Sequence, residues 1–161
     1  MPIAYEPIAE AHADELFEAL SDDALYAFIP ERPPESAEAL RRRYHFLATG
    51  RSPDGLQRWL NWVIRVDGEP VGTLQATIVG ASADVAYVVF TDHQRRGHAT
   101  TALAWLLAWL RSEGVTLARA TVDTRNAPSI ALLRRAGFTL ASTGDADDMP
   151  GQQEHRYSRS L

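Results

Sequence analysis

The sequence predicts a single α/β domain in which a central mixed β-sheet carries helices on both faces. Three observations lead to this prediction. Apolar residues recur at helical spacing as far as Ala48 and at strand spacing from Trp59 onward. Two β-branched and aromatic runs flank Asp67-Gly68, which is the signature of a tight antiparallel hairpin. A strand–helix–strand unit between residues 84 and 123 must be a right-handed parallel crossover.

The predicted elements follow the order β α α β β β α β α β β. Near the N-terminus, the proline-rich segment 21–34 separates two helices, and Ser36 is expected to cap the second one. The next helix ends at Gly114, and the last helix begins after its cap Asn126 and stops at Gly137. The expected ranges are 3–8, 10–20, 36–48, 59–66, 71–78, 84–90, 100–111, 117–123, 127–136, 138–142 and 154–158.

The composition is that of an ordinary globular chain, and it excludes several chemistries. The 161 residues are 45% apolar and 23% charged, and no apolar run approaches the roughly 20 residues that span a bilayer. All 16 basic residues are arginine and there is no cysteine, which excludes a lysine phosphate loop, a Schiff-base lysine and a cysteine nucleophile. The net charge of −5 argues against nucleic-acid binding. The first residues lack a secretory signal, so we expect a cytoplasmic protein with one domain over residues 1–161 and no membrane association.

The most informative stretch is Gln94-Arg95-Arg96-Gly97-His98-Ala99, which joins the apolar run 85–90 to the helical run 100–111. A strand that turns on a glycine and restarts as a helix directs several backbone N–H groups at one point. Those N–H groups lack helical acceptors, and the helix dipole is positive at this end. The junction therefore predicts a site for a phosphate-like anion.

Two motifs make the chain similar to the GNAT superfamily of acetyl-CoA-dependent N-acetyltransferases. The first is a Gln/Arg-x-x-Gly-x-Gly/Ala turn, met here by Gln94, Gly97 and Ala99. The second is Asn-x-x-Ser/Ala followed by an apolar pair and Gly-Phe, met by Asn126, Ser129, Leu132-Leu133 and Gly137-Phe138. Each motif stands at its expected strand–helix junction, and the matched core runs from about residue 59 to 138. The resemblance implies the acyl-CoA N-acyltransferase (GNAT) fold.

Within the superfamily, one branch is the most similar. The run Ala83-Asp84-Val85-Ala86-Tyr87 resembles the acidic-apolar-small-Tyr strand of the ribosomal-protein N-terminal alanine acetyltransferases. The absence of a tyrosine after Leu132 resembles that branch as well.

The resemblance implies that the anion is the pyrophosphate of coenzyme A, held by the main chain of residues 95–100. Gly97 lets the backbone close on the phosphate, and the side chains of Arg95 and Arg96 either add phosphate contacts or stay in solvent. Asn126 is expected to fix the pantetheine arm, to cap its helix, or to do both. The expected acetyl-CoA-binding residues are Val88, Val89, Phe90, Gln94, Arg95, Arg96, Gly97, His98, Ala99, Thr100, Asn126 and Ser129.

The reaction implied is direct attack of a neutral amine on the acetyl carbonyl, without a covalent enzyme intermediate and without a metal. The backbone N–H of Val89 or Phe90 would hold the developing oxyanion. Asp84 is the first candidate for the base, although a carboxylate at the start of a strand also occurs without any role. Water-mediated alternatives are Glu31, Glu35, His45 and His93.

The chain departs from the family pattern at Leu133, where many members carry the tyrosine that protonates the leaving thiolate. Ser129 is the nearest candidate for that acid, or else an ordinary third residue of its helix.

The acceptor remains open at this stage. The two N-terminal helices and the loop from Gly144 to Gln153 would wall its cleft. The candidates are a small amine or a peptide N-terminus, with protein N-terminal alanine acetylation as one alternative. A domain that binds acyl-CoA as a sensor without turnover is another, and an unrelated nucleotide-binding module is the third. We expect a monomer or a homodimer.

Overall fold

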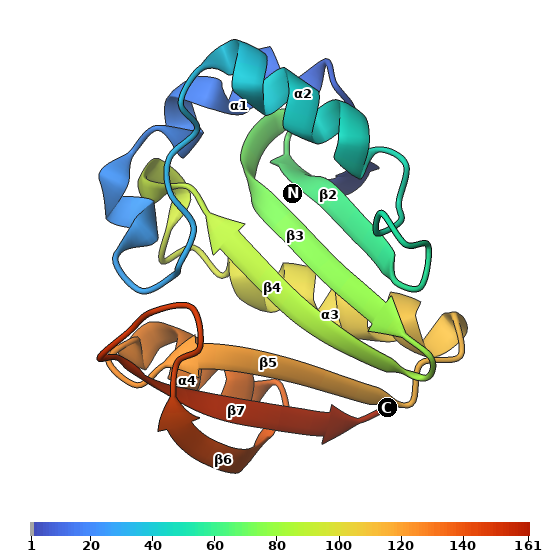
Figure 1. Ribbon diagram of the computed structural model, residues 1–161, viewed down its shortest axis with the longest axis vertical. Coiled ribbons are helices and arrows are strands. Elements are labelled where there is room, and N and C mark those ends of the chain that lie inside the picture. Colours follow the sequence, from blue (N-terminus) through green and yellow to red (C-terminus); the bar gives the residue numbers. More distant parts are fainter. Residues whose placement is uncertain (1) are drawn as a thin grey trace.

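A computed structural model describes residues 2–161 as one seven-stranded sheet with two helices on each face (Figure 1). The predicted fold class and element order are confirmed. The strands are β1 (Ile3–Pro7), β2 (Arg58–Val66), β3 (Glu69–Val79), β4 (Ser82–Val89), β5 (Leu117–Asp123), β6 (Thr139–Asp145) and β7 (Gln153–Ser160). The helices are α1 (His12–Leu20), α2 (Ala37–Leu47), α3 (His98–Ser112) and α4 (Ala127–Arg135), with 3-10 turns η1 (Asp23–Tyr26) and η2 (Thr91–His93).

The strands lie in the order β1-β2-β3-β4-β5-β7-β6, and every pair is antiparallel except β4 with β5. The β2–β3 hairpin turns on Asp67 and Gly68 as predicted, and both residues have positive φ, 52° and 82°. Helices α1 and α2 pack on one face of the sheet, and α3 and α4 lie behind the other (Figure 1).

The parallel pair is short. β4 and β5 are in register only from Ser82–Leu117 to Asp84–Arg119. Beyond that point β4 stays with β3 as far as Val89, and β5 stays with β7 as far as Asp123. Each strand follows its own antiparallel partner, so the two diverge and the sheet opens in a V between them (Figure 1). We call this opening the splay.

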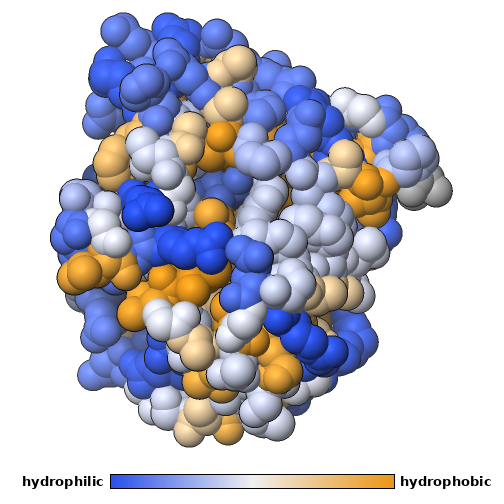
Figure 2. Space-filling model, turned by 90° about the vertical axis from the view of Figure 1, so that its right-hand side faces the viewer, coloured by the Kyte–Doolittle hydropathy of each residue, from blue (hydrophilic) through white to orange (hydrophobic). Residues whose placement is uncertain are grey.

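The core has two parts, one on each face of the sheet. The larger part lies between the sheet and α3, whose buried face carries Leu103, Leu106, Leu107 and Leu110. The smaller part lies under α1 and α2 and includes Leu16, Leu40 and Tyr44. Seen from the right-hand side of Figure 1, the surface is mainly hydrophilic in its upper half, and its larger apolar patch lies lower down (Figure 2). Within residues 2–161, no helix combines the length and the apolar character needed to cross a membrane.

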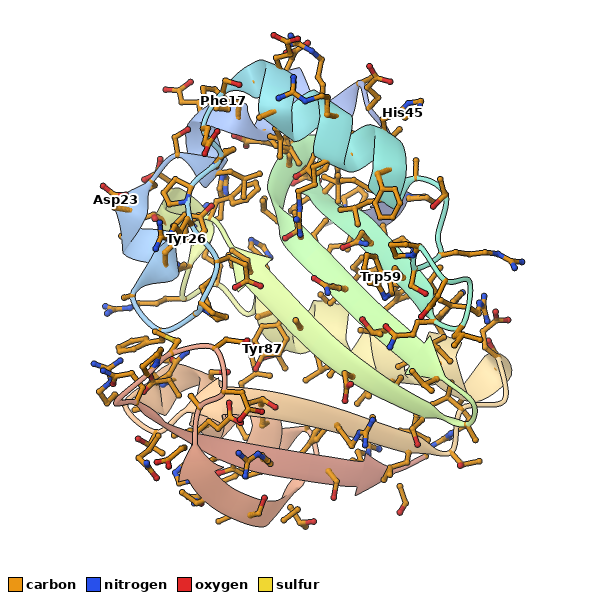
Figure 3. The ribbon with its side chains drawn as sticks, in the orientation of Figure 1. Phe17, Asp23, Tyr26, His45, Trp59 and Tyr87 are labelled. Carbon is orange, nitrogen blue, oxygen red and sulfur yellow. The ribbon has the colours of Figure 1, made fainter. Side chains whose placement is uncertain are left out.

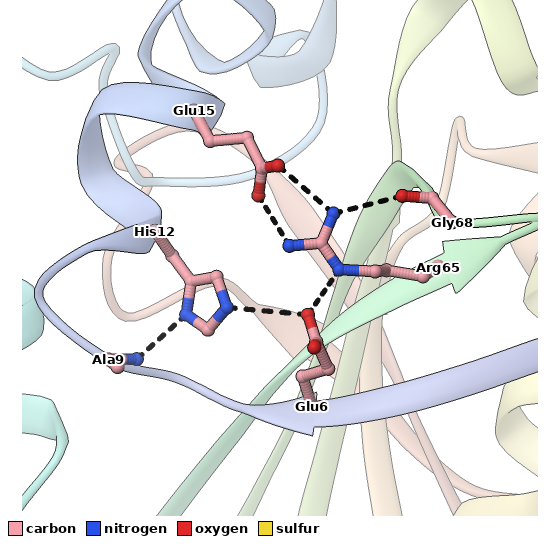
Figure 4. A network of polar contacts seen from close by, with 6 residues as sticks. All are labelled: Glu6, Ala9, His12, Glu15, Arg65 and Gly68. Carbon is pink, nitrogen blue, oxygen red and sulfur yellow. Dashed lines mark hydrogen bonds and ion pairs between the residues drawn. The ribbon is translucent and has the colours of Figure 1, made fainter.

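One ion-pair network joins β1, α1 and β2 (Figure 4). The Arg65 guanidinium donates to both carboxylate oxygens of Glu15, at 2.6 and 3.1 Å, and to the carboxylate of Glu6. His12 accepts the Ala9 N–H at 2.9 Å and lies 3.4 Å from Glu6. The hydrogen bond from Arg65, together with its charge, lowers the pKa of Glu6. The network fixes the start of α1 against the sheet. The last residue of the same helix, Leu20, lines one of the two cavities of the candidate site.

We predict that Arg65→Met lowers the free energy of unfolding by about 1–2 kcal/mol, between the values typical of exposed and of buried ion pairs. The Arg65 side chain is only 17% exposed, which is why the loss exceeds that of a surface pair. Arg42→Met is the matched control: its partner Glu38 is one turn away on α2 and both side chains are exposed, so the change should stay below about 0.5 kcal/mol.

Urea denaturation across a pH series measures both variants. Because the pKa of Glu6 is lowered in the folded protein, its pairing stabilises above the ordinary carboxyl pKa and is lost as the pH falls through the lowered value. The difference between wild type and Arg65→Met should therefore narrow below about pH 4. An equal loss for both variants at neutral pH would contradict the prediction.

Candidate active site

A cavity of about 580 Å³ lies in the splay, and we call it the donor cavity. It is bordered by the end of β4, the turn before α3, the start and one side of α4, and the segment that follows α1. From the set predicted to bind acetyl-CoA, the structure brings together Val88, Val89, Gln94, Arg95, Gly97, His98, Ala99, Thr100, Asn126 and Ser129. Phe90 and Arg96 are not among the residues that line it.

The N-terminus of α3 is open toward the donor cavity. Gly97 is the N-cap residue, with φ 82°, and no side chain caps the helix. The first hydrogen bond of this helix runs from the Thr101 N–H to the Gly97 carbonyl at 3.1 Å. The N–H groups of residues 98–100 therefore have no helical acceptor, and the helix dipole adds positive potential at the same point. The predicted anion-binding geometry is present.

The charges around the donor cavity are all of one sign. Its basic lining residues are Arg95 and Arg135, with His93 and His98 beside them, and no aspartate or glutamate within residues 2–161 lines it. Arg95 holds a positive φ of 63°, which is costly for a residue with a side chain. The whole chain has a net charge of −5, so the positive potential is confined to this cavity. A locally positive cavity favours the binding of a polyanion.

The backbone of β4 offers the Val89 N–H to the splay. The Phe90 N–H donates to the Val71 carbonyl at 2.8 Å, so it is committed to β3. The Val88 carbonyl lies against Gly72 of β3, in the space that a Cβ on Gly72 would need. The Val89 N–H belongs to the same planar peptide unit as that carbonyl and points the opposite way, toward the side that β5 has left.

These contacts place Phe90 outside the donor cavity, and they distinguish the two N–H groups, of Val89 and Phe90, that were considered for the oxyanion. Phe90 is only 4% exposed and packs under α1 and α2, because successive strand residues face opposite sides of the sheet. Of the two N–H groups considered for the oxyanion, the one of Val89 faces the splay. The Val89 carbonyl accepts a hydrogen bond from the Gln94 side chain at 3.0 Å, so Gln94 also fixes the end of the strand.

Helix α4 contributes a polar pair to the donor cavity. The Asn126 side chain caps the helix by accepting the Ser129 N–H at 3.3 Å, as predicted. The Ser129 hydroxyl lies 2.7 Å from the hydroxyl of Tyr87, which reaches it from β4 across the splay (Figure 3). Burial raises the pKa of Tyr87, and the bond to Ser129 lowers it by less. Leu133, at the position where many GNAT members carry tyrosine, is 1% exposed in the core.

A second cavity, of about 390 Å³, lies on the other side of β4 beneath α1 and α2, and we call it the acceptor cavity. Its walls include Tyr26 and Tyr44, whose pKa values are raised by burial, that of Tyr44 to about 12. Four residues line both cavities: Leu25, Ile29, Tyr87 and Val88. Groups bound in the two cavities would therefore meet beside Tyr87 and Val88.

The structure places Asp84 away from both cavities. Its carboxylate pairs with Arg119 at 3.0 Å, both side chains are exposed, and the pair closes the narrow end of the splay. Asp84 is four residues before Val88, about 13 Å along the strand. Of the other base candidates, Glu31 lines the acceptor cavity and His93 the donor cavity, whereas Glu35 and His45 line neither.

The segment from Asp22 to Ile29 crosses the mouth of the splay, and we call it the strap. At one end the Thr91 hydroxyl donates to Asp22 at 2.6 Å. At the other end the Arg125 guanidinium stacks on the Phe28 ring, 5.3 Å from its centre. Asp123, almost fully buried, holds that guanidinium with bonds of 2.8 and 2.9 Å. The strap is thus fastened to both of the diverging strands.

Sequence reasoning missed several residues of this site, namely Gly72, Tyr87, Arg135 and the strap residues Leu25, Phe28 and Ile29. Gly72 did carry a signal, since a lone glycine inside a strand pattern often marks a close backbone approach. Tyr87 carried one as well, since it is the tyrosine of the family-like run 83–87. The others were missed because their positions at the site depend on contacts with distant parts of the chain.

The Acetyltransferase (GNAT) domain family matches residues 3–139. This chain belongs to the GNAT acetyltransferase family. It is accordingly an acyltransferase. A comparison with curated protein sequences finds no match.

Solved GNAT structures share the fold across almost the whole chain. The ribosomal α-N-protein acetyltransferase RimL in complex with coenzyme A has a TM-score of 0.83 at 18% identity, covering 99% of this chain and 94% of that one. Spermidine N-acetyltransferase from Vibrio cholerae, in complex with coenzyme A and spermine, has a TM-score of 0.83 at 15% identity, covering 98% and 95%. An aminoglycoside acetyltransferase in complex with coenzyme A has a TM-score of 0.79 at 16% sequence identity, and the match covers 99% of this chain and 95% of that one.

We predict that Gly72→Ala displaces β4 and with it the Val89 N–H. The added methyl would collide with the Val88 carbonyl oxygen, which is backbone and has little room to move. The expected loss is about 1–3 kcal/mol of unfolding free energy, together with weaker acetyl-CoA binding. Gly144→Ala is the matched control, a strand glycine whose Cβ would meet only the flexible end of Arg156 at 3.2 Å. Thermal unfolding and titration calorimetry measure the two effects, and equal behaviour of the two variants would refute the close-approach argument.

Proposed function

We propose that this GNAT member is an acetyl-CoA-dependent N-acetyltransferase that transfers the acetyl group to a primary amine within a ternary complex. The observation that carries the proposal is the meeting of two cavities at Tyr87 and Val88, one of them basic and placed at an uncapped helix N-terminus. A ternary complex needs two such sites that open onto one point. The coenzyme A complexes of neighbouring folds add support.

The donor cavity fits the parts of coenzyme A. The N–H groups of residues 98–100, with the charges of Arg95 and Arg135, would hold the pyrophosphate. The free edge of β4 at Val88 and Val89 would pair with the amides of the pantetheine arm, and the Asn126 side chain would add a polar contact.

The chemistry assigned to this chain's own groups is modest. The Val89 N–H donates to the carbonyl oxygen as negative charge develops on it. Ser129 stands as the proton donor to sulfur. Glu31 is the carboxylate that lines the acceptor cavity, and it receives the proton of the amine directly or through water. The role of base proposed for Asp84 gains no support from its position beside Arg119.

The charged residues that line the acceptor cavity favour some classes of amine over others. Glu31 is accompanied by two guanidiniums, those of Arg32 and Arg43, and neither guanidinium has an ion-pair partner within residues 2–161. A polyamine would meet repulsion there, whereas a peptide N-terminus or a small amine of low charge would not. This favours a protein α-amine, which is the acceptor named for RimL, and it keeps N-terminal alanine acetylation as the closest alternative.

Gly97→Val is predicted to abolish most acetyl-CoA binding, because a branched side chain disfavours φ 82° and displaces the N–H groups of the turn. We expect the dissociation constant to rise at least about tenfold. Gly55→Val is the control: Gly55 has φ 74°, neither glycine has a neighbouring atom within 4 Å of its Cβ position, and Gly55 lies outside both cavities. Titration calorimetry should find unchanged affinity for the control. Unchanged affinity for Gly97→Val would reject the phosphate turn.

The class of acceptor amine can be tested by measuring turnover on a panel of amines. We predict that kcat/KM for a neutral peptide N-terminus exceeds that for spermidine by about tenfold, which corresponds to about 1.4 kcal/mol of repulsion. The double variant Arg32→Glu with Arg43→Glu should narrow this ratio. Arg42→Glu should not, because Arg42 lies on the same helix but outside the cavity. A preference for spermidine would contradict the assignment, and acetyl-CoA binding without turnover on any amine would favour the sensor alternative.

A further inference from the structure

The hydroxyl groups of Tyr87 and Ser129 form an isolated pair. They lie 2.7 Å apart, and within residues 2–161 neither oxygen has another side-chain hydrogen-bond partner. Tyr87 comes from β4 and Ser129 from the first turn of α4, where the Asn126 cap fixes its backbone. The pair therefore spans the splay at the place where the two cavities join.

We propose that Tyr87 is the proton source for the sulfur that leaves the acetyl group, and that Ser129 carries the proton between them. The inference rests on the proposed function, since it requires acetyl transfer from a thioester. It assigns to a strand tyrosine a step that Leu133, buried and apolar, does not perform in this chain.

The position of Tyr87 suits this step. Tyr87 and Val89 are alternate residues of β4, so their main chains face the same edge about 7 Å apart. The Val89 N–H serves the carbonyl oxygen of the thioester, and Tyr87 stands two residues nearer to the closed end of the splay at Asp84, with its hydroxyl on that of Ser129. A thioester held along this edge would thus have donors for both of its heteroatoms.

The relative acidities explain why the tyrosine is needed. A phenol ionises near pH 10 and a thiol near pH 8.5, whereas the alkyl hydroxyl of a serine is a much weaker acid than either. Ser129 alone has no ready proton to give, but it can donate one while it accepts another from Tyr87. Burial raises the pKa of Tyr87, so the phenol keeps its proton at neutral pH.

The step balances without a further reactant. The amine nitrogen forms the C–N bond, and the C–S bond breaks with its electron pair on sulfur. Ser129 gives its hydroxyl proton to the sulfur and takes the phenolic proton of Tyr87. The amine nitrogen releases a proton to Glu31, directly or through water, and that proton returns through water to the Tyr87 oxygen. The products are the amide and the free thiol.

Kinetics of hydroxyl-deletion variants test the relay. Tyr87→Phe keeps the ring and its packing, and it should lower kcat about 10- to 100-fold, at the low end for a general acid because a thiolate leaves readily. The KM for acetyl-CoA should stay within about twofold. Ser129→Ala should show a similar loss. The double variant should fall no further than the worse single variant, since both act on one proton. Additive losses would overturn the relay.

Tyr157→Phe is the matched control. Tyr157 is 2% exposed, its hydroxyl has no partner within the described chain, and it lies outside both cavities. Its kcat should equal that of the wild type. A drop as large as that of Tyr87→Phe would show that loss of any buried phenol is enough and would overturn the assignment.

A binding measurement separates this inference from the proposed function. The probes are coenzyme A and desulfo-coenzyme A, which lacks the sulfur. Donors aimed at the sulfur stabilise the thiolate, so coenzyme A should gain affinity over the desulfo form between pH 7 and pH 9, by about sixfold if the thiol pKa falls by one unit. Tyr87→Phe should lose most of this gain and keep its affinity for desulfo-coenzyme A.

The outcomes are distinct. If the wild type turns over, and Tyr87→Phe keeps both the wild-type kcat and the wild-type gain in coenzyme A affinity between pH 7 and pH 9, the inference is overturned and the proposed function stands. Failure of the wild type to bind either probe overturns the proposed function, and the inference falls with it.

Discussion

The site depends on the point where the pairing of β4 with β5 stops. Each strand is held by an antiparallel partner along its length, β3 for one and β7 for the other, and the two ladders diverge after Asp84 and Arg119. The separation leaves a strand edge with unpaired main-chain groups inside the molecule, which would be costly without a partner. An extended ligand that carries amides can supply that partner. The opening that gives the enzyme its donor cavity is therefore a consequence of strand pairing, and local loops only border it.

An opening of this kind has to be bridged, and the structure does so at three levels. The Asp84–Arg119 ion pair lies at its closed end, the Tyr87–Ser129 pair crosses it midway, and the strap covers its mouth. The outer bridge consists of one hydrogen bond, from Thr91 to Asp22, and one cation–π contact, of Arg125 with Phe28, so it can open more readily than the packed elements. The inner bridge comes from a strand and a helix. The reacting atoms would thus be held by rigid elements, and the acceptor is enclosed by the more adaptable one.

The sequence predicted those parts of the fold and site that depend on local order. The hairpin at Asp67-Gly68, the caps at Ser36 and Asn126, and the turn from Gln94 to Ala99 each follow from a few adjacent residues, and the structure contains them all. Asp84 lies outside both cavities because it stands at the closed end of the splay, four residues before Val88, where Arg119, thirty-five positions along the chain, pairs with it from β5. Phe90, which the resemblance placed among the acetyl-CoA-binding residues, does not line the donor cavity, and its N–H is committed to Val71 on the partner strand. Tyr87 and Gly72 acquire their roles only from contacts made through the fold.

The chain also illustrates how a net acidic protein presents a basic site. Its excess of carboxylates lies mainly on exposed surface, where solvent screens them, while the donor cavity is lined by Arg95 and Arg135 and, within residues 2–161, by no aspartate or glutamate. Coenzyme A is strongly anionic, so on the proposed function this separation of charge would direct its phosphates to the turn before α3. A thiolate forming beside Tyr87 and Ser129 would have two neutral hydroxyl donors next to it. The proposed relay therefore stabilises the leaving sulfur with neutral donors, a phenol and an alcohol, where the two cavities join.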